Sequence, residues 1–180
     1  MLAAPVPALA QATDTDQGQV AVDARVAPLC ILGDPSRATV DLGQIAATSG
    51  LRVGRLAVLP DQQVTLPDSF CNFAGTVVTA EVDALVEQVT GTPPANFAKA
   101  VNYTASVTDW AISPATASSA AGAAGTPLTG TGASAVRTLP HVADIGVTLS
   151  AFSVPGDLRL VAGTYRGAVR VTLGPAAFAE

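Results

Sequence analysis

Only one side chain in the sequence, His141, has the imidazole that many hydrolytic sites use as a base. Asp144 follows it closely, and Ser134 and Ser150 are the nearest candidate nucleophiles. Neither serine lies in a nucleophile motif, and Pro140 places the histidine in a loop. Proximity in the sequence does not build a catalytic triad, so we expect a surface histidine at the entrance of a strand and no catalytic residue.

Three carboxylates, Glu81, Asp83 and Glu87, alternate along a predicted strand and therefore share one of its faces. A general acid needs its carboxyl group in an apolar setting, so this set predicts a solvated face instead of an acid–base pair. No spacing matches an EF-hand calcium loop, and one histidine with two distant cysteines is a poor ligand set for zinc. We therefore expect no metal, no cofactor and no enzymatic activity.

The opening residues, MLAAPVPALAQA, are uncharged and apolar and end in small residues, as signal peptides do before their cleavage site. We expect cleavage after Ala12, because a polar stretch follows directly. The basic region that precedes such a segment is missing, so the natural start is expected upstream of Met1; the alternative interpretation is an apolar tail. In an exported chain the two cysteines, Cys30 and Cys71, are expected to form a disulfide.

Length and charge narrow the possible functions. Residues 13–180 have the size of one domain with its own core. The formal net charge is -5 and Lys99 is the sole lysine, so the sequence predicts no basic surface for nucleic acid. No apolar run is long enough to cross a bilayer, so no membrane span is expected.

Alternation of apolar and polar residues predicts a series of short strands separated by glycine and proline turns, with no convincing helix. This pattern indicates an all-β fold, an antiparallel β-sandwich. Residues 111–135 are rich in alanine, glycine, serine and threonine, and they predict a long exposed loop. The predicted strands are Gln19–Val26, 38–43, 51–60, 62–66, Thr76–Val89, Val101–Val107, 145–149 and Leu158–Leu173.

The predicted function depends on whether the last predicted strand, 158–173, has a partner on both of its edges. Tyr165, Val169, Val171 and Leu173 share one of its faces, as in a half-buried antiparallel strand. Only GPAAFAE follows, without alternation, so we expect no later segment of this sequence to pair with it. Such a strand is either the normal end of a closed fold or an edge that awaits a partner.

Four motifs in order connect these features with a known family. They are GQVAVDARVAPLC, which leads to the first cysteine; Leu42–Gly43, which ends a short strand; CNFAGTVVTAEVDA, which the second cysteine opens; and AGTYRGAVRVTL. With this set the chain resembles the spore coat protein U domain family, whose fold is used by subunits of archaic (alternative) chaperone–usher pili. The resemblance covers nearly all of the chain after Ala12. GPAAFAE, and the small residues at 111–135 in place of tyrosines and charges, depart from the family pattern.

The resemblance implies an incomplete immunoglobulin-like sandwich that lacks its final strand. The N-terminal extension of the next subunit would supply that strand, a form of β-augmentation called donor-strand complementation. The expected division is a signal peptide at 1–12, a donor extension at 13–24 and the sandwich domain at 25–180. The inward-facing residues of the donor strand would be Gly18, Val20, Val22 and Ala24. One wall of the acceptor groove would consist of Tyr165, Val169, Val171 and Leu173.

The partners implied by the resemblance are other pilus subunits, a periplasmic chaperone and an outer-membrane usher. The protein would then be exported through the periplasm and become a structural subunit of a secreted surface fibre. One alternative is a self-contained secreted coat or envelope protein, in which Gln19–Val26 pairs within its own domain. A tip adhesin is disfavoured, because Trp110 has no aromatic cluster around it in the sequence.

Overall fold

A computed structural model describes residues 17–88, 91–126 and 128–176, and it confirms the all-β antiparallel fold. The expected signal peptide, 1–12, and the first part of the expected donor extension, 13–16, lie outside the described residues. The described ranges contain two short 3₁₀ turns, η1 (Gly50–Arg52) and η2 (Pro155–Asp157). The strands are β1 (Cys30–Ile31), β2 (Gln62–Cys71), β3 (Thr76–Glu87), β4 (Phe97–Ala98), β5 (Ala100–Thr108), β6 (Ala115–Ser118), β7 (Gly130–Ala133), β8 (His141–Ser153), β9 (Arg159–Leu160) and β10 (Tyr165–Pro175).

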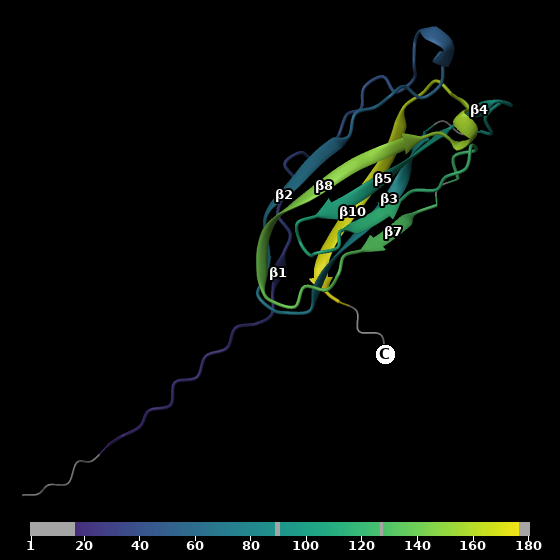
Figure 1. The fold of residues 1–180 in the computed structure, drawn as a ribbon. Coiled ribbons are helices and arrows are strands. Elements are labelled where there is room, and N and C mark those ends of the chain that lie inside the picture. Colours follow the sequence, from purple (N-terminus) through teal and green to yellow (C-terminus); the bar gives the residue numbers. More distant parts are fainter. Residues whose placement is uncertain (1–16, 89–90, 127, 177–180) are drawn as a thin grey trace, which may run out of the picture.

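The main sheet has the strand order β1-β2-β8-β5-β3-β10, with β6 paired to β5 and β7 paired to β3. All of these pairs are antiparallel, whereas the small β4–β9 pair is parallel. Strand β5 joins two layers, because Asn102–Thr108 pair with β8 while Ala100 and Val101 pair with β3 (Figure 1). Strands β1 and β10 lie at the two ends of this order, so no ladder joins them in the described structure.

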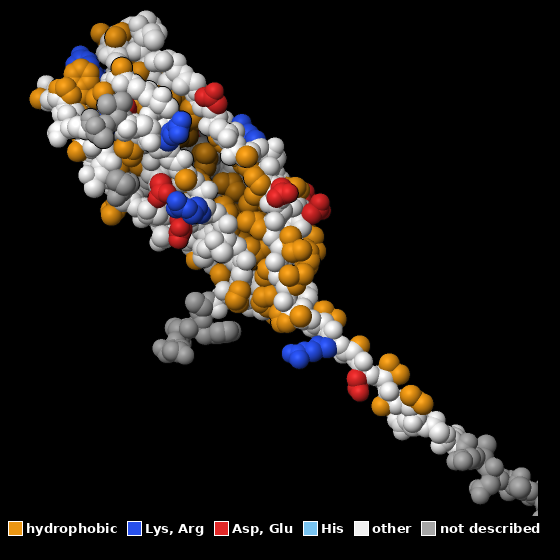
Figure 2. Space-filling model, turned by 180° about the vertical axis from the view of Figure 1, so that it is seen from behind, with side chains coloured by type: hydrophobic (Ala, Val, Ile, Leu, Met, Phe, Trp, Pro, Cys, Tyr) orange, Lys and Arg blue, Asp and Glu red, His pale blue; other side chains and the backbone are white. Residues whose placement is uncertain are grey.

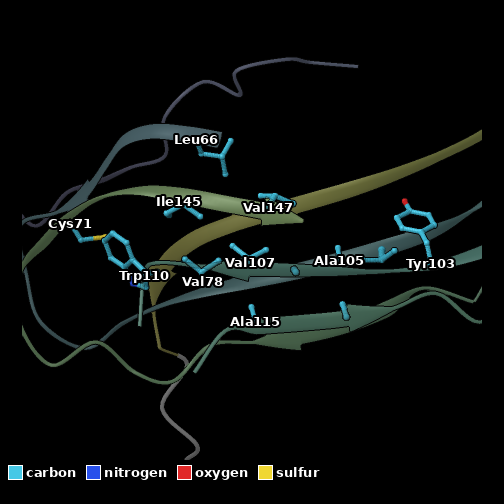
Figure 3. Close-up of a cluster of buried hydrophobic side chains, with 13 residues drawn as sticks. Leu66, Cys71, Val78, Tyr103, Ala105, Val107, Trp110, Ala115, Ile145 and Val147 are labelled. Atoms are coloured by element: carbon cyan, nitrogen blue, oxygen red, sulfur yellow. The ribbon is translucent and has the colours of Figure 1, made fainter. Parts of the chain in front are cut away.

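The main hydrophobic core lies between the two layers. In β3, Val78 and Val82 are fully buried, which confirms the alternation seen in the sequence. Trp110, with 1% of its surface exposed, lies beside Cys71, while Ile145 packs from β8 (Figure 3). Several side chains of the same cluster are only half-buried, among them residues of β2, β8 and β10. The core is therefore covered on most of its surface and open along one side.

The predicted disulfide is confirmed. Cys30 and Cys71 are joined with an S–S distance of 1.98 Å, and they are direct partners in the ladder between β1 and β2. The bond therefore holds the start of the domain to the end of β2. A disulfide is compatible with an exported, non-cytoplasmic protein.

Three strands predicted before β2 are not formed. Residues 19–26 are extended but belong to no ladder. Residues 50–60 contain η1 and a single bridge from Leu56 to Ala46 instead of a strand. Gly50 and Gly54 have φ values of 74° and 78°, in the left-handed region that glycine tolerates, and they bend the chain back on itself. Residues 38–43 pass along the domain without a ladder partner.

The prediction of an exposed loop at 111–135 was wrong. This segment contains β6 and β7, and Ala115 and Ala117 are almost fully buried. The small residues are needed because the two backbones approach closely. A Cβ atom on Gly130 would lie 1.9 Å from the carbonyl oxygen of Ser118, and one on Gly132 would lie 2.0 Å from that of Thr116. The small apolar area of this segment gives no sign of such close packing of backbone on backbone, which glycine permits.

Candidate functional site

An open apolar groove of about 900 Å³ follows the side on which the core is incompletely covered. Its walls come from β10 and from residues 32–42, and side chains of β2, β5 and β8 form its floor. Figure 2 shows hydrophobic side chains exposed in a band along this face, which runs toward the end where the N-terminal segment leaves. The apolar lining residues are Leu32, Pro35, Ala38, Val40, Leu42, Val64, Leu66, Leu85, Tyr103, Val147, Leu149, Phe152, Tyr165, Ala168, Val169 and Val171.

Strand β10 forms the first wall. On one side it pairs with β3 along almost its whole length, for example Val169 with Val82 and Val171 with Ala80. Its other edge has no ladder partner within the described residues and borders the groove. The backbone groups along such an edge can pair with an added strand.

The four residues expected to form this wall lie along β10. Tyr165, Val169 and Val171 line the groove and are half-buried. Leu173 is half-buried as well and packs against the main core, but it lies outside the lined part of the groove.

Gly167 of β10 determines the shape of this wall, although it is not among the residues expected to form it. The register between β3 and β10 shifts at Gly167, where Ala84 and Leu85 lie opposite this single residue. A Cβ atom on Gly167 would lie 2.8 Å from the carbonyl oxygens of Ala84 and Asp83, so a side chain there would push the strands apart. Bulges of this kind are frequent at sheet edges, where they redirect side chains.

The second wall, residues 32–42, is only loosely attached to β2. The N–H of Ser36 donates to the carbonyl of Thr65 at 2.7 Å, and the N–H of Thr65 donates to Ser36 Oγ at 3.0 Å. Arg37 reaches across to the carbonyl of Gln63 at 2.6 Å. The segment therefore borders the groove as an extended chain outside any regular ladder.

Two tyrosines, Tyr103 and Tyr165, link the strands around the part of the groove farthest from the disulfide. Tyr103 stacks on Phe152 with ring centroids 5.7 Å apart, and its hydroxyl donates to the carbonyl of Ala168 at 3.2 Å. The hydroxyl of Tyr165 donates to the carbonyl of Val161 at 2.8 Å. Burial raises the pKa of both phenols to about 12, so both remain neutral donors at physiological pH. A second cavity of about 500 Å³, bordered by Tyr165 and residues 40–46, continues the groove at this end.

Residues 17–29 form an extended segment outside the domain. Figure 1 shows it leaving beside β1, in line with the long axis of the sandwich. It forms no ladder, and the apolar side chains of Val20 and Val22 are 85% and 88% exposed. Gly18 and Ala24 are exposed as well, and Val26 continues the alternation with 83% exposure. The segment continues to Leu29, beyond the boundary expected after Ala24.

The side chains of His141, Ser134 and Asp144, three of the four candidate catalytic residues, make structural contacts. His141 begins β8, as expected, with its Nδ1 3.1 Å from Arg137 and its ring edge-on to Trp110. Ser134 Oγ accepts from the N–H of Val78 at 3.1 Å and donates to a backbone carbonyl. Asp144 accepts from the backbone N–H of Asp68 at 2.9 Å. Ser150 is a half-buried residue of β8 paired with Thr104.

Glu81 and Asp83 lie opposite Arg170 of β10, with N–O distances of 3.8 Å and 3.0 Å. A hydrogen bond from Thr129 and the guanidinium of Arg170 lower the pKa of Asp83. This part of the predicted solvated face is therefore an ion-paired surface.

Glu87 contradicts the expectation of a solvated face. It is only 3% exposed and lies 3.2 Å from Lys99, the sole lysine of the chain. The turn before β10 covers it, because a Cβ atom on Gly163 would lie 2.4 Å from the Glu87 carboxylate. A lone lysine next to a buried strand was the signal in the sequence that could have indicated a buried ion pair.

Within residues 17–88, 91–126 and 128–176, no group of three or more histidine, cysteine, aspartate or glutamate side chains could hold a metal ion. No helix in the same ranges has the length and apolar character needed to cross a membrane. No known family, curated protein or solved structure matches the chain, so its function has to be argued from the groove and the extended segment themselves.

Proposed function

We propose that this protein is a structural subunit of a secreted surface fibre, in which residues 17–26 of one copy complete the sandwich of the next. One observation carries the proposal: an open apolar groove lies beside a strand edge that is unpaired within the described residues, and an exposed apolar segment forms no ladder there either. An added strand would receive main-chain hydrogen bonds from β10, and its alternate side chains would enter the groove.

The segment fits the groove in length and pattern. Strand β10 has 11 residues, and the exposed segment 17–29 is extended along its whole length, so it can follow most of this edge. Val20, Val22 and Ala24 would face the half-buried valines of β10, Val169 and Val171. Their burial would cover apolar surface that both parts of the chain now expose to water.

The direction of insertion follows from the positions of the two ends. Pro175 pairs with Thr76, while Leu29 is hydrogen-bonded to Asn72, so the segment leaves the domain at the end where β10 finishes. We call this the disulfide end, and the opposite end, which carries η1, the η1 end. A donor strand running antiparallel to β10 would have its Leu29 at the η1 end of the acceptor. The disulfide end of each copy would then face the η1 end of the next.

This head-to-tail contact leaves one groove and one donor segment unused at opposite ends of every assembly, so it propagates as a filament. Insertion parallel to β10 would instead bring two disulfide ends together and could close as a pair. Antiparallel pairing is the more stable arrangement per residue, which favours the open filament.

An unfilled groove exposes apolar surface and a strand edge, both of which promote aggregation. The proposal therefore includes a periplasmic chaperone that covers the groove before assembly and an outer-membrane usher that receives the subunits. These partners come from the resemblance to archaic chaperone–usher subunits. Export through the periplasm agrees with the disulfide between Cys30 and Cys71.

The proposal is tested with refolded protein that begins at Thr13. Size-exclusion chromatography and electron microscopy should show ladders or fibres for the unmodified chain. Val22→Asp should abolish them, because the new carboxylate must be buried without a partner or exclude the strand, at a cost of several kcal/mol. Ala21→Asp is the matched control: it adds the same charge to the other face of the strand and should leave assembly intact. A stable monomer from the unmodified chain would favour the self-contained coat protein, and fibres from Val22→Asp would exclude this segment as the donor.

A further inference from the structure

The point where the extended segment joins the domain is fixed by one side chain, Asn72. The N–H of Leu29 donates to Asn72 Oδ1 at 2.7 Å, and Asn72 Nδ2 donates to the carbonyl of Ala27 at 2.9 Å. The backbone N–H of Asn72 donates in turn to the carbonyl of Leu29 at 3.0 Å. Three hydrogen bonds therefore hold the last residues before β1 in one direction.

The backbone on both sides of these hydrogen bonds is constrained by the disulfide and by a proline. Asn72 directly follows Cys71, whose disulfide partner Cys30 directly follows Leu29. Between the two residues that Asn72 contacts lies Pro28, whose ring fixes its backbone φ angle. The disulfide, the proline and the asparagine together form what we call the root of the segment, residues 27–30 with Cys71 and Asn72.

The root decides which groove the segment can reach. The groove of the same copy opens near the root, because Leu32, just after β1, lines it. To enter that groove, residues 17–26 would have to reverse direction at residues 27–29 and run parallel to β10. A reversal at these residues would move the Ala27 carbonyl relative to the Leu29 N–H, and Asn72 now holds both groups, so its two bonds oppose the reversal.

Insertion into the groove of the same copy would otherwise have a large advantage. A donor on the same chain has an effective concentration of roughly millimolar, far above that of a second copy in dilute solution. A subunit that filled its own groove would be lost to the fibre as both donor and acceptor. A device that keeps the segment away from its own groove is therefore needed for assembly.

We propose that Asn72 is a positioning residue that directs the donor segment away from its own groove and so leaves both available to a second copy of this chain. The inference rests on the proposed function, because it concerns the same groove and the same segment. Asn72 acts only through the direction of the chain at Ala27 and Leu29.

The test uses full-length mature protein and a labelled peptide of residues 17–29. Monomer from the unmodified chain should bind the peptide, because its groove is open. In Asn72→Ala two side-chain hydrogen bonds are lost. The loss should shift the equilibrium between open monomer and monomer whose segment fills its own groove about tenfold toward the filled form. The variant should therefore give more stable monomer, and that monomer should bind correspondingly less peptide. Gln88→Ala is the matched control, since its side-chain amide donates to the carbonyl of Val86, at the end of β3 opposite Asn72.

Asn72→Asp provides a second measurement. It retains an acceptor for the N–H of Leu29 but loses the donor to Ala27, so its shift should lie between those of the unmodified chain and Asn72→Ala. If both Asn72 variants bind peptide and polymerise like Gln88→Ala, Asn72 does not direct the segment. Failure of the unmodified chain to bind the peptide would instead overturn the proposed function itself.

Discussion

Val169 of β10 pairs with Val82 of β3 on one side and borders the open groove on the other. Val82 is fully buried, whereas Val169 is only half-buried, so burial falls from one strand to the next at the edge of the sheet. A strand added beside β10 would give Val169 the second neighbour that Val82 already has.

Removal of the disulfide should weaken the domain and loosen the root of the segment together. The two cysteines are 41 residues apart, and the loop that they close contributes about 4 kcal/mol by the chain-entropy estimate. The double variant Cys30→Ala, Cys71→Ala should therefore lose roughly that much free energy of unfolding, measured by urea denaturation. An unchanged urea midpoint would show that the ladder between β1 and β2 suffices without the bond.

Much of the fold could be predicted from local pattern, because alternation directly reports burial on one face of a strand. Val78 and Val82 show this in β3, and the confirmed disulfide shows how two cysteines can constrain a fold. The predictions failed where contacts between separate segments of the chain determine whether a side chain is buried. The buried Glu87 depends on Lys99 and on the turn at Gly163, which lie far from it in the sequence.

The candidate site was predictable only in part. The alternation along β10 placed Tyr165, Val169 and Val171 on one face, and the structure shows that they line the groove. The alternation could not reveal the bulge at Gly167, which depends on the approach of Ala84. The second wall, residues 32–42, has no periodic pattern, and only the three-dimensional structure shows that it borders the groove.

Gly132 should be intolerant of any side chain. In Gly132→Ala the new Cβ atom would lie 2.0 Å from the carbonyl oxygen of Thr116, so β6 and β7 must separate. Overpacking of this kind typically costs about 1–3 kcal/mol, which thermal unfolding would detect. Gly122→Ala is the control, because no atom lies within 4 Å of its added Cβ. Equal stability of the two variants would mean that β6 and β7 adjust without strain.

Stability should fall at alkaline pH through the two groove tyrosines. Their folded pKa values are about 12, while an unfolded tyrosine has a pKa of about 10, so the unfolded chain loses these protons first. The stabilising contribution is complete below pH of about 10 and is lost as the pH rises to about 12. Tyr103→Phe should flatten this part of the stability–pH curve, measured by urea unfolding at several pH values. An unchanged slope in the variant would contradict burial of the phenol.

Val171→Asp should damage the acceptor groove while Thr172→Asp leaves it intact. Val171 is half-buried and packs against the core, whereas Thr172 is exposed on the opposite face of β10. A carboxylate at position 171 loses apolar contact with the core and must also be covered when a donor strand enters, which costs several kcal/mol. We expect lower thermal stability and no binding of the peptide of residues 17–29. Binding that survives in Val171→Asp would place the donor elsewhere.

Mixing experiments can separate the two roles that each subunit has in the proposed fibre. A Val22→Asp subunit has an intact groove, including Val169 and Val171, so it should accept a donor strand from an unmodified copy but supply none itself. Added to unmodified protein, it should therefore cap fibres at one end only. Fibre length should decrease as its share increases, and labelled variant should be found at a single end in electron micrographs. Ala21→Asp, labelled in the same way, should be distributed along the fibres. Label at both ends, or throughout the fibres for Val22→Asp, would show that the contact is not the directional one that a donor segment and an acceptor groove create.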